Sequence, residues 1–535
     1  HSSQNKNSLP DNTIHSIFVD TNSKIWIATN CGLSLFDPFR ETFRNFKDVS
    51  GIHYTIQRAI YNVYSTSDDR IWVGTVSDLC YFDSKDTDLI LSGKKNVNHM
   101  FIQDIYWGIS NPTVYCVFED SFKNVWIGSN GGGASFISST SSFFHSWRIN
   151  KIPGVTNGLN DKEVLTICVA DNGNIWMGTD GGGINVNIDG RNCMFYSHDT
   201  GDISSNTYHS SLKDSNGDLW FGNMYNEMGI DVFISKEGRF IHYTPQGNGS
   251  VIYCLFEDNQ RNVWIGSNNG LEIYNLITKK KDFLNKENSQ LLTNEIKAVS
   301  QDKNGNIWIG TLNKGISIYN PESKTMKHIN EHTIFENCVI NQIFRDSKNR
   351  IWIATTEGLV LFPNEQSDTY QLFNTQNGLA CNLICSIEED SEGNIWLSTH
   401  SGISCFIESE QRFLNYDHKD GTLFGTYMNN SVGKAQDGTI YFGSINGVCY
   451  FNPKDRPSNI ILPPVIFTDF KVYGRNPHED AIDTSIPMTN GKIMLNHNQN
   501  IFSITFNVMN KSLQGKVEYA YKLEGLEENW INIGG

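Results

Sequence analysis

Asparagine, aspartate, tyrosine and histidine side chains gather in this chain immediately before short apolar segments. NDKE at residues 160–163, NTYHS at 206–210 and NEIK at 294–297 each lead into such a segment. Amides and carboxylates form paired hydrogen bonds with hydroxyl groups, and aromatic rings stack on the apolar faces of sugar rings. Such residues around one opening predict a site for a ligand rich in hydroxyl groups, an oligosaccharide.

A second group of candidates lies in the loop between the second and third strands of the repeat described below. One of these loops, MYNEMG at 224–229, is two residues longer than its Gly-rich counterparts. The candidate ligand-binding residues on the two kinds of loop are Asp161, Lys162, Asp180, Tyr208, His209, Tyr225, Asn226, Glu227, Tyr253, Asn269, Glu295, Lys297, Asn313, Lys314, Asn341, His400, Tyr427 and Asn429. The competing interpretation is that each polar residue only solvates its loop or caps a strand end.

The charged candidates limit the kind of ligand. Arginine is scarce in these loops, which disfavours a densely sulfated or polyanionic glycan. Lys162, Lys297 and Lys314 leave room for a single carboxylate.

Catalytic and metal-binding patterns are weak by comparison. The sequence contains no HExxH, GxSxG or CxxC pattern, and the CxxxC of Cys381 and Cys385 has nothing nearby to complete a metal-ligand set. NGGG at Asn130 and DGGG at Asp180 are not followed by Gly-Lys-Ser/Thr, so they indicate tight turns rather than phosphate loops. No metal site and no cofactor are predicted.

The candidate loops must be positioned by a repeated element. Aligned on one aromatic residue, the copies are centred on Trp26, Trp72, Trp126, Trp176, Trp220, Trp264, Trp308, Trp352, Trp396 and Tyr441. From Trp176 to Trp396 the period is 44 residues, which is typical of a four-stranded propeller blade. In the copy at 294–335, EIKAVSQD, IWIGT, ISIYN and TMKHIN alternate as four short strands with turns between them.

Two conserved features of the repeat are interpreted as scaffold. An Asp six residues before the Trp, as in Asp302 and Trp308, suits a hairpin turn, because its carboxylate bonds backbone N–H groups two residues on. A Trp at one position in nearly every copy suits packing between blades better than sugar stacking. The fold class is therefore all-β, with seven-bladed β-propellers of four-stranded antiparallel blades.

Composition and charge exclude several other classes. With 42 Lys+Arg against 58 Asp+Glu the net charge is −16, so nucleic acid is not an expected partner. The 11 Cys have no paired spacing, and several lie in apolar runs, as small buried hydrophobes do. No stretch approaches eighteen uninterrupted apolar residues, and no signal-peptide pattern marks the N-terminus.

The repeat resembles a known family. The pattern D-x-x-G-x-[IVL]-W-[IVFML]-[GA]-[TS] followed by G-[LI]-x-x-[YF] is similar to the two-component regulator propeller repeat of periplasmic sensors in glycan-foraging gut bacteria. After PPVIFTDFKVYG at 463–474, the segment with Tyr519, Tyr521, Leu523, Gly525 and Trp530 resembles the start of the Ig-like β-sandwich called the Y_Y_Y domain. The resemblance implies a hybrid two-component system: two seven-bladed propellers, the sandwich, a transmembrane helix, and a cytoplasmic histidine kinase and response regulator.

The copies predict three domains. Residues 1–142 form an incomplete N-terminal propeller with three blades, residues 143–457 a seven-bladed propeller, and residues 458–535 the start of a truncated Y_Y_Y sandwich. The last blade lacks a fourth strand of its own, because the Pro-rich FNPKDRPSNIILPP follows Tyr450. FFHSWRI at 143–149 is predicted to supply that strand and close the ring.

The expected function follows from the resemblance and the polar loops together. The chain is expected to be the periplasmic ectodomain of an inner-membrane protein, joined to the membrane only through an absent transmembrane helix. It is expected to bind an oligosaccharide, to form a homodimer, to regulate glycan-utilisation genes, and not to be an enzyme itself. Two alternatives stay open. One is a propeller glycosidase or lyase using acidic pairs such as Asp161 and Glu163, and the other is a protein-interaction propeller without a small ligand.

Overall fold

The structure is a computed structural model that divides the chain into two compact units. One unit consists of residues 141–457, and the other consists of residues 1–140 and 458–535. The structure describes residues 7–46, 59–91, 98–100, 111–139, 143–149, 158–188, 193–224, 229–246, 251–329, 333–336, 338–364, 369–456, 465–472, 488–489, 492–493, 495, 500–508, 517, 519–527 and 529–534.

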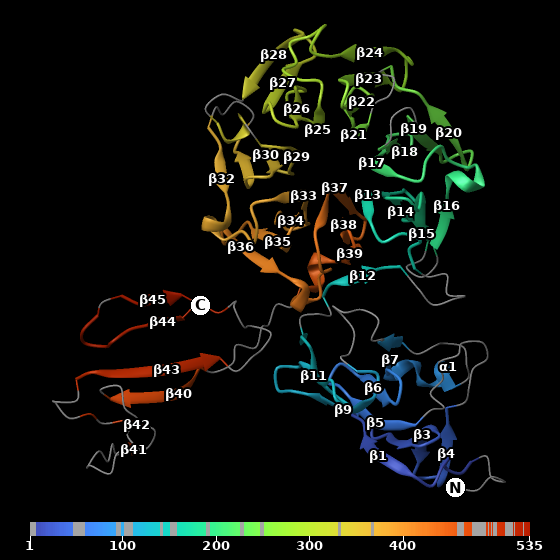
Figure 1. Cartoon of the computed structure of the whole chain (residues 1–535), viewed down its shortest axis with the longest axis vertical. Helices are drawn as coiled ribbons and strands as arrows, with labels where there is room; N and C mark the ends of the chain where they lie inside the picture. Colours follow the sequence, from blue (N-terminus) through green and yellow to red (C-terminus); the bar gives the residue numbers. More distant parts are fainter. Residues whose placement is uncertain are drawn as a thin grey trace. The chain divides into compact units, whose positions relative to one another are not determined.

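The unit of residues 141–457 is a ring of seven four-stranded antiparallel sheets (Figure 1), and its innermost strands line a channel at the centre. The innermost strands are β13 (Val164–Val169), β17 (Tyr208–Lys213), β21 (Ile252–Glu257), β25 (Ile296–Gln301), β29 (Ile340–Arg345), β33 (Ile384–Glu389) and β37 (Tyr427–Lys434). The second strands are β14 (Ile175–Thr179), β18 (Leu219–Asn223), β22 (Asn262–Ser267), β26 (Ile307–Thr311), β30 (Ile351–Thr355), β34 (Ile395–Thr399) and β38 (Ile440–Ser444).

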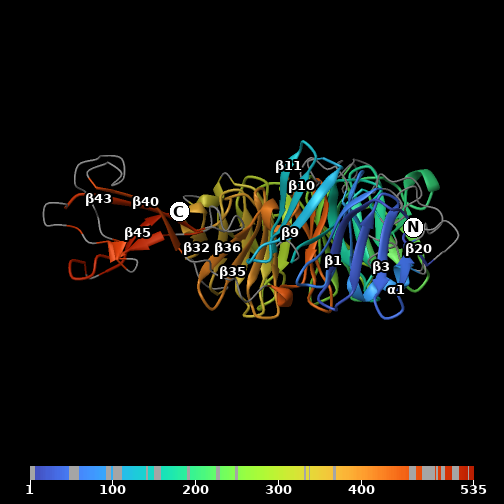
Figure 2. The same cartoon turned by 90° about the horizontal axis from the view of Figure 1, so that it is seen from below.

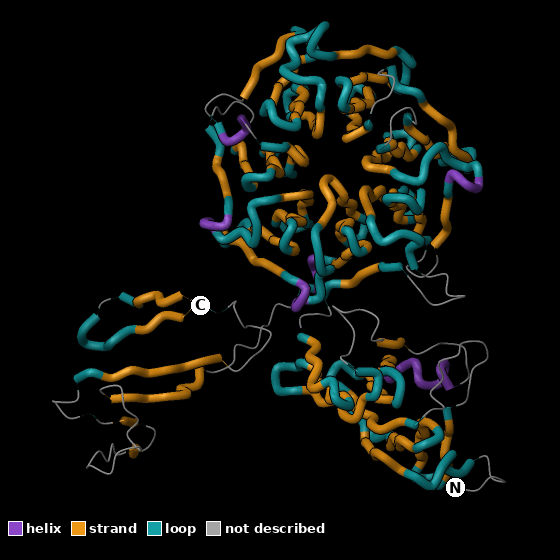
Figure 3. Tube along the Cα trace, viewed as in Figure 1, coloured by secondary structure: helices purple, strands orange, loops and turns teal. Residues whose placement is uncertain are grey.

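The outer half of each blade contains shorter, more exposed strands. The third strands are β15 (Ile184–Asn187), β19 (Ile230–Ile234), β23 (Leu271–Asn275), β27 (Ile316–Asn320), β31 (Leu359–Phe362), β35 (Gly402–Ile407) and β39 (Gly447–Phe451). The outermost strands are β16 (Cys193–Tyr196), β20 (Arg239–Tyr243), β24 (Lys281–Leu284), β28 (Thr325–Ile329), β32 (Gln371–Phe373), β36 (Arg412–Tyr416) and β12 (His145–Trp147). Figure 2 shows blade strands running between the two faces of the ring. In Figure 3 this unit is almost entirely strand and loop.

The ring is closed by a strand from the start of the unit. β12 pairs antiparallel with β39, with His145 opposite Tyr450, Ser146 opposite Cys449 and Trp147 opposite Val448. The sheet order is β12-β39-β38-β37, so the first strand of the unit completes its last blade. The pairing predicted for residues 143–149 is confirmed, and the last blade has four strands like the other six.

In most blades the turn that precedes the Trp is held by an Asp side chain that also binds the indole. In the blade of Trp308, Oδ1 of Asp302 accepts backbone N–H bonds from Asn304 and Asn306 at 2.9 Å each. Oδ2 of Asp302 accepts the indole N–H of Trp308 at 3.1 Å. Gly305 closes the turn at a φ of +88°. Trp308 is 1% exposed, so the interpretation of the repeated Trp as scaffold is confirmed.

The same indole bond joins Asp20–Trp26, Asp120–Trp126, Asp214–Trp220, Asp258–Trp264, Asp346–Trp352 and Asp390–Trp396. Trp176 differs, because Ala170 lies at the Asp position. Its buried Nε1 has no hydrogen-bond partner in the part of the chain that the structure describes.

Neighbouring blades are joined by an apolar core and by polar clamps. Trp352, for example, packs against Phe373 of its own blade and Phe406 of the next, at centroid distances of 6.1 and 5.7 Å. The last residue of an innermost strand then binds the turn of the preceding blade, in the pairs Lys213–Asp171, Glu257–Ser215, Gln301–Asn259 and Glu389–Ser347. A ring fixed in this way positions its loops rigidly.

The second unit contains three further blades and three small sheets. The first blade contains β1 (Ile14–Val19), β2 (Ile25–Thr29), β3 (Gly32–Asp37) and β4 (Thr42–Asn45). The second contains β5 (Ile60–Ser65), β6 (Arg70–Thr75), β7 (Leu79–Asp83) and β8 (Asn98–Met100). The third has three strands, β9 (Val114–Glu119), β10 (Val125–Ser129) and β11 (Gly133–Ile137). The short helix α1 (Thr87–Leu91) follows β7.

The C-terminal residues form two-stranded sheets. These are β40 (Val465–Val472) with β43 (Phe502–Val508), β41 (Met488–Thr489) with β42 (Lys492–Ile493), and β44 (Tyr519–Tyr521) with β45 (Ile531–Gly534). The Y_Y_Y sandwich stays a prediction. Within the described ranges, no helix is long and apolar enough to cross a membrane.

Candidate functional site

The candidate site is the channel of the 141–457 ring and the face on which the innermost strands begin, called here the mouth face. The loop between β14 and β15 lies on this face, because the backbone N–H of Asp180 donates to Glu163 O at 3.1 Å. The N–H of Gly181 donates to Asn206 O of the next blade at 3.0 Å. The two kinds of candidate loop therefore share one face in this blade.

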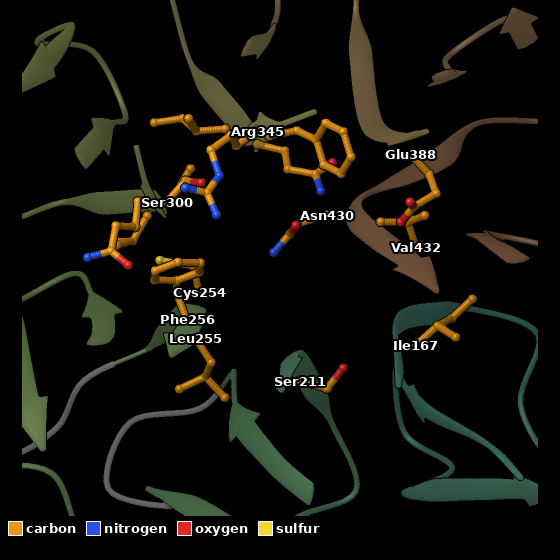
Figure 4. Close-up of a pocket in the computed structure, with 16 residues that line it drawn as sticks. Ile167, Ser211, Cys254, Leu255, Phe256, Ser300, Arg345, Glu388, Asn430 and Val432 are labelled. Atoms are coloured by element: carbon orange, nitrogen blue, oxygen red, sulfur yellow. The ribbon is translucent and has the colours of Figure 1, made fainter. Parts of the chain in front are cut away.

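A cavity of about 380 Å³ lies in the channel, within the size range of small-ligand pockets. All seven innermost strands contribute to its lining (Figure 4). One arc of the wall, from β13 to β21, is mostly apolar and includes Ile167, Leu255 and Phe256. The remaining arc, from β25 to β37, carries Gln301, Gln342, Arg345, Glu388 and Asn430. Apolar residues such as Val299 and Phe344 lie among them, so the channel presents both apolar surface and polar side chains, which suit a sugar ring with an apolar face and hydroxyl groups.

Two polar residues of the cavity lack partners. Gln342 accepts the N–H of Ile387 at 2.6 Å, and Glu388 is paired with Lys434 at 2.9 Å. The side chains of Arg345 and Asn430 have no hydrogen-bond partner among the described residues. Both point into the cavity in Figure 4.

The position of Arg345 has a simple electrostatic reason. Arg345 is the last residue of β29. In other blades the residue at this position binds the turn of the preceding blade. The matching turn residue here is Lys303, which has the same charge and is an unfavourable clamp partner. The guanidinium extends into the channel instead (Figure 4).

Asn430 is placed by an enlarged bulge. In six innermost strands one residue is bulged after the first, as Lys297 is between Ile296 and Ala298. In β37 the register jumps from Tyr427 to Val432, and Asn430 adopts a φ of +56°. A left-handed non-glycine residue in an enlarged bulge is typical of a site where a side chain has been redirected.

Three single-residue bulges form a cluster at the mouth face. They are His209, Tyr253 and Lys297, the second residues of β17, β21 and β25. The Nζ of Lys297 lies 3.5 Å from the centroid of the Tyr253 ring, and the His209 and Tyr253 rings are 6.0 Å apart at 78°. Tyr253 and Lys297 are each followed by a residue that lines the cavity, Cys254 and Ala298 respectively.

Burial controls the protonation of this cluster. It lowers the pKa of His209 to about 4, and the nearby Lys297 charge lowers that pKa further. Burial also lowers the pKa of Lys297 below its usual range, while Cys254 and Glu295 act in the opposite direction. Near neutral pH the imidazole is therefore neutral. Its Nδ1 is buried without a hydrogen-bond partner in the described part of the chain.

The other predicted residues are distributed unevenly. Exposed loop positions on the mouth face are occupied by Lys162, Asp180, Asn269, Asn313, Lys314 and His400, and Asp161, Glu295 and Asn429 are half-buried. Lys162 forms an ion pair of 2.9 Å with Glu163. Tyr225, Asn226 and Glu227 lie outside the described residues.

Three predicted loop residues are buried strand residues. Tyr208 and Tyr427 begin β17 and β37 and are 0% and 1% exposed. The Tyr208 hydroxyl donates to Asp231, and the Tyr427 hydroxyl oxygen accepts the Leu423 N–H. Asn341 is also buried and donates to Ile384 O of the next blade at 2.7 Å. These three side chains are therefore buried within the ring and are not exposed in the loops of the mouth face.

The sequence does not predict the cavity residues Arg345, Glu388 and Asn430, because they lie on strands whereas the candidates were assigned to loops. One signal was present: Tyr427 lies two residues further from Tyr441 than Tyr208 lies from Trp220. That extra length is the enlarged bulge.

The described residues also include side chains of the types used in metal binding and acid–base catalysis. No group of three or more His, Cys, Asp or Glu side chains that could hold a metal ion occurs in the described ranges. The acidic pair Asp161 and Glu163 is tied locally, since Asp161 accepts the Glu163 N–H at 2.8 Å and Glu163 binds Lys162. The arrangement suits recognition of a polar ligand.

Comparison with known proteins identifies the repeat. The family model described as "Two component regulator propeller" matches residues 8–31, 108–131, 158–181, 246–269, 290–313, 334–357 and 378–401. These segments contain the turn and second strand of seven blades in the two units.

Solved structures extend the similarity to nearly the whole chain. The extracellular domain of the putative hybrid two-component system BT3049 from B. thetaiotaomicron is 36% identical, with a TM-score of 0.76, over 98% of this chain and 68% of that chain. The extracellular domain of the putative hybrid two-component system BT4673 from the same organism is 19% identical, with a TM-score of 0.50, over 99% of this chain and 76% of that chain, and shows the fold alone.

A curated protein matches over a shorter stretch. "Histidine kinase P4" of Formosa agariphila is 35% identical over 118 residues, which are 22% of this chain and 9% of that protein. The match to this curated relative thus spans less than a tenth of its length. The repeats and the match to BT3049 together carry the assignment: this chain belongs to the family of two-component regulator propeller proteins that form the extracellular domains of hybrid two-component systems.

Proposed function

We propose that this chain is the ligand-sensing, periplasmic part of a hybrid two-component system, and that the 141–457 ring binds an oligosaccharide at its mouth face and channel. Binding would signal across the membrane to a histidine kinase and response regulator that regulate glycan-utilisation genes. The proposed partners are the oligosaccharide and a second copy of the chain. Residues 458–535, as a Y_Y_Y sandwich, would connect the propeller to the membrane.

One observation carries the binding part of this proposal. The channel joins an apolar wall at Leu255 and Phe256 to unpartnered polar side chains at Arg345 and Asn430. Arg345 is exposed and Asn430 is half-buried, so both side chains are available to a ligand whose hydroxyl groups and apolar face match the two kinds of surface.

Signalling adds a thermodynamic requirement. A ligand shifts an equilibrium between two arrangements only by the difference in its affinity for them. A rigid ring such as this one is suited to hold the ligand, while the change of arrangement must occur in another part of the assembly.

The test is a thermal-shift screen of the whole 535-residue chain against oligosaccharides of defined linkage, followed by calorimetry and product analysis. A ligand present at a hundredfold excess over Kd stabilises the folded state by about 2.7 kcal/mol. Stabilisation with the sugar recovered intact supports a sensor. Stabilisation with shortened sugar identifies a glycosidase or lyase instead, and no stabilisation by any sugar favours a protein-interaction propeller.

A further inference from the structure

The bulged residues of the innermost strands are not equivalent around the ring. Of the six single-residue bulges, Leu165, Asn341 and Cys385 are buried, at 4%, 4% and 0% exposure. His209, Tyr253 and Lys297 are half-buried and occupy three consecutive blades. One arc of the mouth face therefore carries an imidazole, a phenol ring and an ammonium group on consecutive blades. The bulged residues of the other three strands are buried in the ring.

The cluster holds a positive charge that no carboxylate of the described residues pairs directly, although Glu295 is near enough to raise the pKa of Lys297. No carboxylate oxygen of the described residues lies within 4.0 Å of Lys297 Nζ. The ammonium instead lies over the Tyr253 ring, an attraction that weighs more when the cation is partly desolvated. Other lysines of this unit behave differently: Lys162 is paired with Glu163, Lys213 with Asp171 and Lys434 with Glu388.

A half-buried ammonium with no acceptor is costly, because desolvation of the charge is not repaid. A carboxylate placed above the cluster would supply the acceptor, and its charge would be balanced by one lysine. The surrounding chain favours a single negative charge over many, since its net charge is −16 and the cluster itself contains one cation. The Tyr253 ring and the adjoining channel wall at Cys254 and Leu255 offer apolar surface for the sugar ring that carries the carboxylate.

We propose that His209, Tyr253 and Lys297 form a subsite for the carboxylate of an acidic saccharide, so that the ligand of this ring contains a uronic acid unit. Lys297 binds the carboxylate, Tyr253 holds the ammonium in place from below, and the neutral His209 contributes a hydrogen bond to a neighbouring hydroxyl group. This inference rests on the proposed function, because it specifies the chemical class of the oligosaccharide.

The direct test uses the unmodified chain. Trisaccharides of uronic acids that differ in stereochemistry and linkage are titrated calorimetrically, each beside its carboxyl-reduced neutral counterpart and a neutral trisaccharide carrying one sulfate ester. The proposal expects at least one uronic acid trisaccharide to bind at least tenfold more tightly than its reduced form. It also expects this preference to diminish as the salt concentration rises.

A pair of variants locates the subsite. Lys297→Met should lose at least tenfold in affinity for the uronic acid trisaccharide and little for the reduced form, and Lys297→Arg should restore part of the loss. The matched control is Lys324→Met, an exposed lysine of the same blade in the turn between β27 and β28, which should leave both affinities unchanged. Thermal denaturation of each variant checks that its ring is folded. If a variant does not fold, the comparison of trisaccharides on the wild-type chain still tests the proposal.

The outcomes separate this inference from the proposed function. If a reduced or sulfated trisaccharide binds as tightly as the uronic acid form, or if Lys297→Met leaves the preference intact, the carboxylate subsite is wrong although saccharide sensing stands. If no saccharide of any kind binds, both are wrong.

Discussion

Trp147 and Val448 are opposite each other in the sheet that closes the ring, although almost the whole 141–457 unit separates them in the sequence. The strand that contains Trp147, β12, is short, but the two residues that precede β12 are buried in the core. Phe143 and Phe144 are each 4% exposed and pack against Phe451 at 5.3 and 5.0 Å. Closure thus depends on apolar burial as well as on backbone pairing.

Removing one of these rings should therefore weaken the whole propeller. Phe143→Ala is expected to lower the free energy of unfolding by about 3–5 kcal/mol, the usual cost of deleting a buried aromatic side chain. His145→Ala, on the same segment but exposed, should change it by less than about 0.5 kcal/mol. Urea denaturation of both variants measures the difference, and equal effects would show that residues 143–147 do not close the ring.

The missing Asp before Trp176 offers a stabilising substitution. Ala170→Asp should supply the acceptor that the buried Trp176 indole lacks and stabilise the chain by about 1 kcal/mol. Ala435→Asp is the matched control, because Ala435 precedes Tyr441 at the same spacing and Tyr441 has no indole N–H. If both variants raise the denaturation midpoint equally, the gain comes from the backbone of the turn and not from a hydrogen bond to the indole.

Acid should destabilise the mouth face through His209. Its pKa of about 4 in the folded state is below the value of about 6.5 expected in the unfolded chain. The unfolded state therefore binds more protons as the pH falls from about 6.5 to about 4, and stability is lost over that range. His209→Gln should show a shallower loss of unfolding free energy between these pH values. Parallel pH profiles for the two proteins would contradict this account.

Asn430 allows backbone strain and ligand contact to be separated. Because its φ is +56°, Asn430→Gly should leave stability within about 0.5 kcal/mol, whereas Asn430→Val should cost about 1–2 kcal/mol. The glycine variant should nevertheless bind oligosaccharide more weakly than wild type, since the amide in the cavity is gone. Calorimetry after denaturation controls checks this, and unchanged affinity in Asn430→Gly would exclude the amide from the site.

The scaffold was easier to predict from the sequence than the site. The spacing of Trp176 to Trp396, the Asp302 turn and the strand at 143–149 each follow from local patterns that recur, and the structure contains all three. The indole bond to Asp was not anticipated, because hairpin chemistry alone explains an Asp at that position.

The site was predicted only in part, for a physical reason. His209, Tyr253 and Lys297 are predicted as polar residues next to the starts of strands. Whether such a side chain faces the mouth or the core depends on a single-residue bulge. Tyr208 is one residue before His209 and is buried. Arg345 and Asn430 depend on contacts between blades and on an enlarged bulge, which a single repeat does not reveal.

Hydrogen–deuterium exchange of the whole chain, with and without the tightest-binding oligosaccharide, tests the central claim most directly. The account predicts that the ligand slows exchange in peptides that cover the starts of β17, β21 and β25 and the bulge of β37. Exchange in the blades of residues 7–139 should not be slowed by direct contact with the ligand. Protection confined to residues outside 141–457, with saturating ligand bound, would contradict it.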